Sequence, residues 1–498
     1  METTIDVGEA EMLKAVFLPF PITSHTIRVV DTARLFAMHG VDVTIITTPG
    51  NTKVFQTSID HCDSGHIRIH LVNFPGIPGL PQGFETFTAH TPQHLVPQIF
   101  EGISLLQDPI QQLFATMKPD FIVSDMFFPW SADAAAELGI PHLIYLGGSY
   151  ISRSARNSIE QYAPHTKVDS DSEPFLLPGL PHKLHMTRLQ LPAQTRERNH
   201  LTELMKTVKE SEKKSYGSLI NSFYEFEGIY EEHYKTTTGT KSWSVGPVSL
   251  WVNQDESDKD VRGGASEERE PEGWLTWLDS KTEDSVLYVC FGSMNKFSTS
   301  QLVEIAHALE DFGHDFIWVV GKFEDQGEIG GVNGFLKEFE NRVVVKSRGY
   351  LIRGWAPQLL ILDHPAIGGV VTHCGWNTTL ESVIAGLPMA TMPLFAEQFY
   401  NEKLLVDVLG IGVSIGVKKW KKWNEVGDEI VKRENIVKAI SLLMGGGEEA
   451  LEMRRRARVL GEAAKKTIQP GGCSHTKVKG LIDELKALKL QKFNHKIA

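Results

Sequence analysis

The most informative segment of the chain spans residues 355–398 and reads WAPQLLILDHPAIGGVVTHCGWNTTLESVIAGLPMATMPLFAEQ. Inside it, residues 367–372 (IGGVVT) are a short apolar run, which is typical of a buried strand in a parallel sheet. A glycine-containing turn follows, and apolar residues at helical spacing begin near Asn377. The segment therefore predicts a strand, a turn and a helix, which together are the repeating part of an α/β fold.

The same strand–helix pattern occurs in both halves of the chain. In the first half, the apolar run 15–20 precedes helical spacing over 27–38 and a β-branched run over 41–47. In the second half, the apolar run 286–291 precedes helical spacing over 301–310 and a further strand. Each set is a βαβ unit, so the sequence predicts two doubly wound α/β domains with parallel sheets. Ligands of such domains bind beyond the carboxyl ends of the strands, here in a cleft that the two domains are expected to face.

The domain boundaries are predicted from changes in composition. Residues 1–250 are expected to form the N-terminal domain, and residues 272–475 the C-terminal domain. Residues 251–271 (WVNQDESDKDVRGGASEEREP) are acidic and almost free of aliphatic residues, so they are expected to form an exposed linker. Residues 476–498 carry an amphipathic pattern and are expected to form a helix that packs back towards the N-terminal domain.

Composition excludes several classes of protein. The 498 residues include 50 Lys and Arg against 62 Asp and Glu, a formal net charge of −12, and 41% are hydrophobic. These values exclude general disorder and collagen, and an acidic surface disfavours nucleic acid as a partner. No signal peptide or membrane span is expected, so the predicted location is cytoplasmic. The protein is also predicted to be a monomer. The four cysteines are far apart and predict neither disulfides nor zinc: Cys62, Cys290, Cys374 and Cys473.

The turn after residues 367–372 has the properties of an anion site. The first turn of a helix leaves backbone N–H groups unpaired at the positive end of the helix dipole. Asn377 and Thr378 suit helix capping and can also donate to phosphate, Gly375 permits close backbone approach, and His373 adds a donor. Any one of these residues could simply satisfy backbone groups at a turn. The whole set at this spacing predicts a diphosphate site, through which an acidic protein can hold one nucleotide.

Two flanking residues extend this site to a nucleotide. Trp355 offers a flat face for a base, and Glu381 lies one turn into the helix, where it can accept from ribose hydroxyls. The 44 residues 355–398 resemble the signature box of the plant family-1 UDP-sugar glycosyltransferases, and the resemblance extends over nearly the whole chain. It is strongest to legume enzymes that glycosylate triterpenoid saponins and their aglycones. The resemblance implies the two-domain GT-B fold, with the donor held mainly by the C-terminal domain.

Donor-binding residues follow from the resemblance, position by position. They are Trp355 and Ala356 for uracil, Gln358 and Glu381 for ribose, Ser293, His373, Gly375, Asn377 and Thr378 for the diphosphate, and Trp376, Glu397 and Gln398 for the sugar. The family usually has Asp at the Glu397 position, which is a mild departure. Gln398 resembles the residue of glucose and glucuronate users, whereas galactose users tend to have His. No cofactor and no metal are expected, because the helix N-terminus and His373 can stabilise the leaving UDP.

A histidine and an aspartate are the predicted catalytic pair. His25 lies in the turn between the first strand and its helix, and its pKa range suits a general base. Asp125 follows the strand at 121–124, also at a carboxyl end. Each could serve only as a helix cap. However, residues 18–35 resemble the family's catalytic loop, and this implies that Asp125 orients His25 and stabilises its protonated form.

Arg28 departs from the family pattern, which has proline three residues after the histidine. An arginine in the first helical turn opposes the helix dipole at a cost of about 0.3–1 kcal/mol, so a compensating partner is expected. Asp31 is one candidate, at i+3. The carboxylate of a donor sugar is the other, because arginine binds carboxylates bidentately. The predicted donor is therefore UDP-glucuronic acid, with UDP-glucose as the alternative.

The acceptor is predicted to be bulky and hydrophobic. Residues 177–181 and 210–216 resemble members that act on triterpenoids, while a flavonoid or another small hydrophobic acceptor stays an alternative. The sequence leaves open whether the acceptor hydroxyl belongs to the aglycone or to a sugar of a triterpenoid glycoside. The candidate acceptor-binding residues are Phe127, Phe128, Tyr150, Met186 and Leu191.

Together these features predict an inverting UDP-sugar-dependent glycosyltransferase. A non-catalytic terpenoid-binding protein is the alternative from another class, and the presence of both His25 and Asp125 argues against it. A nicotinamide oxidoreductase is disfavoured because no GxGxxG follows either domain's first strand. Asp169-Ser170-Asp171 could suggest the metal site of a different glycosyltransferase fold, but no strand precedes it and it is predicted to be a solvated loop.

Overall fold

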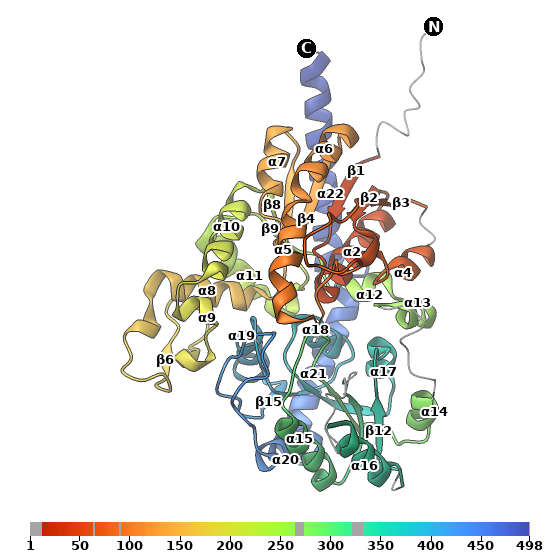
Figure 1. Cartoon of the computed structure of the whole chain (residues 1–498), viewed down its shortest axis with the longest axis vertical. Coiled ribbons are helices and arrows are strands. Elements are labelled where there is room, and N and C mark those ends of the chain that lie inside the picture. Colours follow the sequence, from red (N-terminus) through yellow and green to blue (C-terminus); the bar gives the residue numbers. More distant parts are fainter. Residues whose placement is uncertain are drawn as a thin grey trace. The chain divides into compact units, whose positions relative to one another are not determined.

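The computed structural model describes residues 12–62, 65–88, 91–263, 273–320, 332–345 and 347–497. Its contacts divide the chain into two compact units (Figure 1). The first unit comprises Met1–Gly147, His200–Gly264 and Lys466–Ala498, and the second comprises Gly148–Asn199 and Ala265–Lys465.

The first unit is built on a seven-stranded sheet in which all neighbouring strands are parallel. Its order is β3-β2-β1-β4-β5-β8-β9, so the chain builds outwards from β1 on one side and from β4 on the other. The gap in connectivity between β1 and β4 is a topological switch point, where α/β sheets bind ligands. The strands are β1 (Lys14–Leu18), β2 (Asp42–Thr47), β3 (Ile67–Leu71), β4 (Phe121–Asp125), β5 (His142–Leu146), β8 (Gly217–Ile220) and β9 (Ser242–Ser244).

Helices connect these strands and cover the sheet. They are α2 (Thr23–Met38), α3 (Pro49–Thr52), α4 (Gln56–Asp60), α5 (Val96–Ser104), α6 (Gln107–Met117), α7 (Ser131–Glu137), α10 (His200–Lys214), α11 (Tyr224–Thr238), α12 (Val248–Val252), α13 (Glu256–Val261) and α22 (Cys473–Ile497). Helix α2 carries a long run of buried residues from Thr26 to Ala37, which includes charged ones. Its apolar positions join those of β1 and β2 in one hydrophobic core.

The second unit repeats the plan with a six-stranded, fully parallel sheet of order β12-β11-β10-β13-β14-β15. The strands are β10 (Val286–Cys290), β11 (Asp315–Val319), β12 (Gly349–Ile352), β13 (Ile367–Thr372), β14 (Met389–Thr391) and β15 (Gly412–Ser414), and β6 (Phe175–Leu176) pairs with β7 (His185–Met186) apart from this sheet. The helices are α8 (Tyr150–Tyr162), α9 (Ala193–Arg196), α14 (Gly273–Asp279), α15 (Thr299–Phe312), α16 (Val332–Val345), α17 (Gln358–Asp363), α18 (Trp376–Ile384), α19 (Gln398–Lys403), α20 (Arg433–Met444) and α21 (Glu448–Thr467). The switch point here lies between β10 and β13. The predicted α/β class with two Rossmann-like sheets is confirmed.

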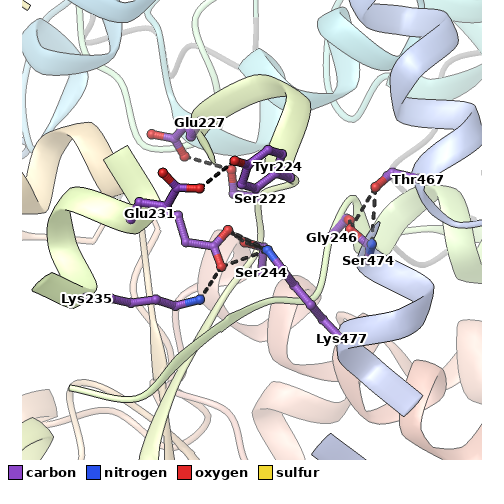
Figure 2. A network of polar contacts seen from close by, with 11 residues as sticks. Ser222, Tyr224, Glu227, Glu231, Lys235, Ser244, Gly246, Thr467, Ser474 and Lys477 are labelled. Carbon is purple, nitrogen blue, oxygen red and sulfur yellow. Dashed lines mark hydrogen bonds and ion pairs between the residues drawn. The ribbon is translucent and has the colours of Figure 1, made fainter. Parts of the chain in front are cut away.

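The C-terminal helix α22 belongs to the first unit and runs along its elements (Figure 1). Polar contacts accompany its buried apolar face. The Lys477 ammonium lies 2.7 Å from both carboxylate oxygens of Glu231, which is almost fully buried on α11 (Figure 2). Lys235 lies 2.5 Å from the same carboxylate, so two cations neutralise one buried anion. The α22 residues in the core cluster are Val478, Leu481, Ile482 and Leu485.

The acidic stretch 251–271 is only partly exposed in its described part: residues 254–257 are exposed, whereas its first three residues are buried. Trp251, Val252 and Asn253 are buried at 6%, 4% and 1% exposure. Helix α13 follows, and Asp258 lies 3.2 Å from the guanidinium of the buried Arg34 on α2. The acidic residues thus face a cation more than 200 positions earlier, a partner that composition alone cannot reveal. Residues 264–271 lie outside the described residues.

Residues 148–199 were predicted to belong to the N-terminal domain, but their contacts place them in the second unit. The Ser149 hydroxyl donates to Asn401 Oδ1 at 2.6 Å, and the Leu189 carbonyl accepts from the Trp420 backbone N–H at 2.8 Å. These long-range hydrogen bonds join the segment to residues that follow the 355–398 region. The boundary after β5 therefore differs from the predicted one.

Candidate active site

A histidine–aspartate pair lies at the switch point of the first unit. His25 is the third residue of α2, which follows β1, and Asp125 ends the neighbouring strand β4. His25 Nδ1 lies 2.7 Å from Asp125 Oδ2, although the two residues are 100 positions apart. The imidazole is 16% exposed and the carboxylate is fully buried. The two residues that the sequence singled out are thus brought together.

The geometry assigns the histidine tautomer. An ionised carboxylate can only accept hydrogen bonds, so Nδ1 of His25 must carry the hydrogen that faces Asp125. The other oxygen of Asp125 accepts from the Phe127 backbone N–H at 3.0 Å, which fixes the carboxylate. His25 Nε2 is then left with a lone pair that can accept a proton. This is the arrangement of a general base with an orienting acid.

Aromatic rings surround His25. Phe20 and Phe127 have ring centroids 6.4 Å and 5.2 Å from the imidazole, and Phe20 also contacts Phe87 and Phe100 at 6.3 Å and 6.4 Å. Phe100 is 39% exposed, so part of this wall is open to a ligand. The sequence had indicated only Phe127 of these four rings. Phe87 and Phe100 follow no motif, and only the fold brings them beside Phe20.

The other four acceptor candidates are buried side chains. Phe128 packs against Phe20 in the first unit and is 3% exposed. Tyr150, Met186 and Leu191 belong to the second unit and are almost fully buried, at 1% exposure or less. A bulky apolar residue looks the same in a sequence whether it lines a pocket or fills a core. These four side chains are buried, and their contact with an acceptor stays a prediction.

Arg28 is the unusual charge of helix α2. It is 6% exposed, and its Nε donates to the Ser24 carbonyl at 2.8 Å. Its Nη1 is buried and has no hydrogen-bond partner within the described residues. Asp31, the partner considered from the sequence, instead pairs with Arg262 at 3.0 Å. Arg28 lies in the second turn of the helix, which begins at Thr23, rather than in the first.

The space beside Arg28 is shared with His25. A Cβ placed on Gly147 would lie 3.3 Å from His25 Cε1 and 3.9 Å from Arg28 Nη1. Both side chains therefore reach the same glycine at the end of β5. An unsatisfied guanidinium nitrogen beside the base can bind a carboxylate there.

The predicted diphosphate loop lies at the switch point of the second unit. Strand β13 ends at Thr372, and α18 begins at Trp376 with Gly375 as its N-cap residue. Within the described residues, the N-cap Gly375 makes no side-chain capping bond, and the N-terminus of α18 carries the positive end of the helix dipole, which favours an anion. Asn377 and Thr378 are the second and third helical residues rather than caps. Their backbone N–H groups belong to the first turn of α18, at the positive end of its dipole.

His373 is packed between two glycines. Cβ atoms placed on Gly292 and Gly375 would lie 2.6 Å and 2.3 Å from His373 Nε2, so a side chain fits at neither position. Gly292 also has φ +76°, and Ser293 follows it as an exposed residue. Burial, with a smaller effect of Lys421, lowers the pKa of His373 to about 4. This histidine is therefore a neutral donor at pH 7, not a cation.

Lys421 is a cation that the sequence reasoning missed. Its ammonium donates to the Lys296 carbonyl and lies 5.2 Å from the Phe297 ring centroid, in the loop after β10. Burial lowers the pKa of Lys421 to about 8. It comes 23 positions after the end of the 355–398 segment, so no motif includes it. Its charge acts on His373 and adds to the positive potential of the loop.

The predicted ribose-binding residues are paired. Gln358 Nε2 donates to Glu381 Oε2 at 2.5 Å, and Gln358 Oε1 accepts from the Tyr288 hydroxyl at 3.2 Å. Gln358 begins α17 and Glu381 lies within α18, so the hydrogen bond between them joins two helices. Trp355 and Ala356 directly precede α17 and are half-buried, which leaves part of the indole accessible.

Two of the three predicted sugar-binding residues are buried, and the third is half-buried. Gln398 is 3% exposed, and its Oε1 accepts from the backbone N–H groups of Leu394 and Phe395, both at 2.9 Å. Only its amide NH₂ is left for a ligand. Glu397 is half-buried and lies 3.3 Å from a Cβ placed on Gly148, whereas Trp376 is 2% exposed and contributes mainly to packing.

Two further features are absent from the described residues. No helix there is both long and apolar enough to cross a membrane. No group of three or more His, Cys, Asp or Glu side chains gathers there in a way that could hold a metal ion.

Two parallel Rossmann-like sheets with an acid–base pair at one switch point and an anion loop at the other define a GT-B glycosyltransferase. The family model for UDP-glucoronosyl and UDP-glucosyl transferases matches residues 110–424. The chain belongs to this family and is a UDP-glycosyltransferase.

Named relatives agree with this assignment. Soyasapogenol B glucuronide galactosyltransferase of Glycine max is 62% identical over 96% of this chain and 97% of its own length. UDP-glucosyl transferase 73DL1 of Saponaria officinalis is 43% identical over 96% of each chain. The crystal structure of Glycyrrhiza uralensis UGT73P12 complexed with glycyrrhetinic acid 3-O-monoglucuronide has a TM-score of 0.94, 67% identity and 98% coverage of both chains.

Proposed function

We propose that this enzyme transfers glucuronic acid from UDP-glucuronic acid to a hydroxyl of a triterpenoid glucuronide, with inversion at the anomeric carbon. The unpartnered Arg28 Nη1 beside His25 is the observation that carries the choice of donor. The choice of acceptor is supported by two relatives: the soyasapogenol B glucuronide galactosyltransferase of Glycine max, and the Glycyrrhiza uralensis enzyme whose crystal structure is complexed with glycyrrhetinic acid 3-O-monoglucuronide.

In the proposed reaction, His25 Nε2 accepts the proton of the acceptor hydroxyl. The acceptor oxygen attacks the anomeric carbon from the face opposite UDP, and the bond from that carbon to the UDP oxygen breaks. The electron pair leaves with UDP, whose charge is stabilised by the first N–H groups of α18 and by neutral His373. Asp125 holds the imidazole and stabilises its cationic form. None of these steps requires a metal ion.

Arg28 would bind the carboxylate of the donor sugar. A buried guanidinium nitrogen without an acceptor is costly, and a sugar carboxylate would supply two acceptor oxygens. UDP-glucose and UDP-galactose carry a neutral hydroxymethyl group at that position and would leave Arg28 unsatisfied. The enzyme should then discriminate against them.

The test is a measurement of kcat/KM with three donors and one triterpenoid monoglucuronide. The wild type should prefer UDP-glucuronic acid to UDP-glucose and UDP-galactose. In Arg28→Ala, kcat/KM for UDP-glucuronic acid should fall about tenfold to a hundredfold, because a charge-assisted hydrogen bond is lost, and the ratio to UDP-glucose should fall with it. Arg28→Lys should retain only part of the wild-type kcat/KM for UDP-glucuronic acid, since lysine lacks the planar guanidinium that binds a carboxylate bidentately.

Arg34→Gln is the matched control. Arg34 is equally buried on the same helix, but it has its own partners in Asn253 and Asp258. Its loss should lower stability without changing the donor ratio. An unchanged donor ratio in Arg28→Ala would rule out donor recognition by Arg28. If the affinity for a glucuronide acceptor fell instead, Arg28 would be assigned to the acceptor.

A galactosyl donor is the second candidate, because the Glycine max relative at 62% identity is named a galactosyltransferase. Gln398 disfavours it, since galactose users of this family tend to have His there. The UDP-galactose arm of the donor panel decides between them.

A further inference from the structure

The diphosphate loop contains a residue in an unfavourable backbone conformation. Cys374 has φ +62°, which places it in the left-handed region that residues other than glycine seldom occupy. It lies between His373 and Gly375, directly before α18. The turn at Cys374 decides where the N–H groups of the next residues point. Such a conformation persists only when its surroundings hold it.

A buried side chain forms a hydrogen bond with the backbone of this turn. Asn401 on α19 is fully buried, and its Nδ2 donates to the Cys374 carbonyl at 2.8 Å. The Cys374 N–H donates to Thr372 Oγ1 at 3.1 Å, so both polar backbone groups of Cys374 are bound within the second unit. The loop is therefore restrained on both sides of the strained residue.

The orientation of the Asn401 amide is itself determined. The Cys374 carbonyl can only accept, so the NH₂ group must face it, and Oδ1 then accepts from the Ser149 hydroxyl at 2.6 Å. Ser149 is the N-cap residue of α8, where it also accepts from the Ser152 N–H at 3.2 Å. The restraint thus runs from α8 through Asn401 to the loop.

We propose that Asn401 is a positioning residue for the donor. It keeps Cys374 in the left-handed conformation before the nucleotide arrives, so that the loop from His373 to Asn377 binds the diphosphate without rearranging. Asn401 touches neither sugar nor phosphate and acts only through the Cys374 carbonyl. This inference rests on the proposed donor site. It assigns a role to a residue that lies three positions beyond the 355–398 segment.

The test compares UDP binding and steady-state kinetics in full-length variants. In Asn401→Ala, the Kd of UDP by titration calorimetry should rise about tenfold, because the loop loses the bond that holds it. The KM for the UDP-sugar should rise by a similar factor. The kcat at saturating donor should change much less, since bound donor restores the loop. A general loss of folded protein would instead lower kcat and leave Kd unchanged.

Gln301→Ala is the matched control for a lost buried amide. Gln301 is 3% exposed in the same unit, donates to the Val431 carbonyl at 3.0 Å and accepts from the Val431 N–H at 2.7 Å. Its removal should lower the melting temperature about as much as Asn401→Ala does, with no change in the Kd of UDP. If Asn401→Ala does not fold, Ser149→Ala keeps the amide but removes the hydrogen bond to its Oδ1, and should raise the Kd by a smaller factor.

A second substitution tests the backbone argument directly. Glycine occupies φ above zero as readily as below, so Cys374→Gly should make the loop less dependent on Asn401. In the double variant, the rise in Kd caused by Asn401→Ala should be several-fold smaller than in the wild-type background. Additive effects, or an unchanged Kd in both Asn401→Ala and Ser149→Ala, would overturn the inference. Failure of the wild type to bind UDP would instead overturn the proposed donor site.

Discussion

The two units place their sites at equivalent positions of their sheets but fill them with different chemistry. In the first unit, the residues that follow β1 and end β4 are His25 and Asp125, a titratable pair 2.7 Å apart. In the second unit, the loops after β10 and β13 contribute glycines, backbone N–H groups and His373, whose pKa is lowered to about 4. The same topology thus supports proton transfer in one unit and neutral anion binding in the other. The sheet topology therefore decides where a site lies, while a few loop residues decide which chemistry the site supports.

The largest expected effect separates these two roles. His25→Ala should lower kcat by about a thousandfold, because a positioned general base contributes about 10² to 10⁴ in rate. The Kd of UDP should stay at its wild-type value, since the donor loop belongs to the other unit. Steady-state kinetics and calorimetry on the same preparation check both. Retained turnover would show that the base lies elsewhere, and weakened UDP binding would show that the roles are not separate.

For Trp355, the predicted contact of the nucleotide base, we expect the converse result: weaker UDP binding with little change in kcat. Trp355→Ala should raise the Kd of UDP about tenfold to a hundredfold, because base stacking on an aromatic face is worth about 1–3 kcal/mol. The kcat at saturating donor should change little. Trp277→Ala is a suitable control, since Trp277 is a half-buried tryptophan of the same unit that packs against Tyr350. Equal Kd values for the two variants would remove Trp355 from the donor site.

A smaller difference is expected in the response of the two units to pH. In the first unit, burial lowers the pKa of His142 to about 3, and in the second, burial lowers that of His373 to about 4. Both stay neutral in the folded state while the unfolded chain takes up protons below about pH 6.5. Each therefore stabilises its unit above that pH, and this contribution is lost as the pH falls from 6.5. In the second unit, burial also raises the pKa of Glu402 to about 7, which has the opposite sign: stability is gained as the pH falls from 7 towards 4.5.

The first unit should consequently lose more stability than the second between pH 7 and pH 5. Differential scanning calorimetry at several pH values can follow the two unfolding transitions. Glu402→Gln removes the opposing group and should make the second unit as sensitive to acid as the first. Equal pH slopes of the two transitions in the wild type would contradict the assignment.

Local signals predicted the parts of the molecule that are encoded within short windows. The apolar run at 367–372 coincides with β13, and alternating strands and helices identified both sheets. His25 and Asp125 were recognisable because each follows a strand, and parallel strands bring their carboxyl ends together. The stretch 251–271 was misread, because the charges that face it come from α2 and are far away in the sequence.

The sequence by itself determined the α/β class, the family and the residue types at both switch points, because periodicity and short motifs carry this information locally. Only the tertiary structure decided which charges are satisfied. Among the described residues, it paired Asp31 with Arg262 and left Arg28 Nη1 without a hydrogen-bond partner, and it placed Asn401 against the strained Cys374. It also separated Phe127, beside the base, from apolar residues that fill a core. Burial and hydrogen bonding depend on residues that are distant along the chain, and the packing of the fold alone brings them together.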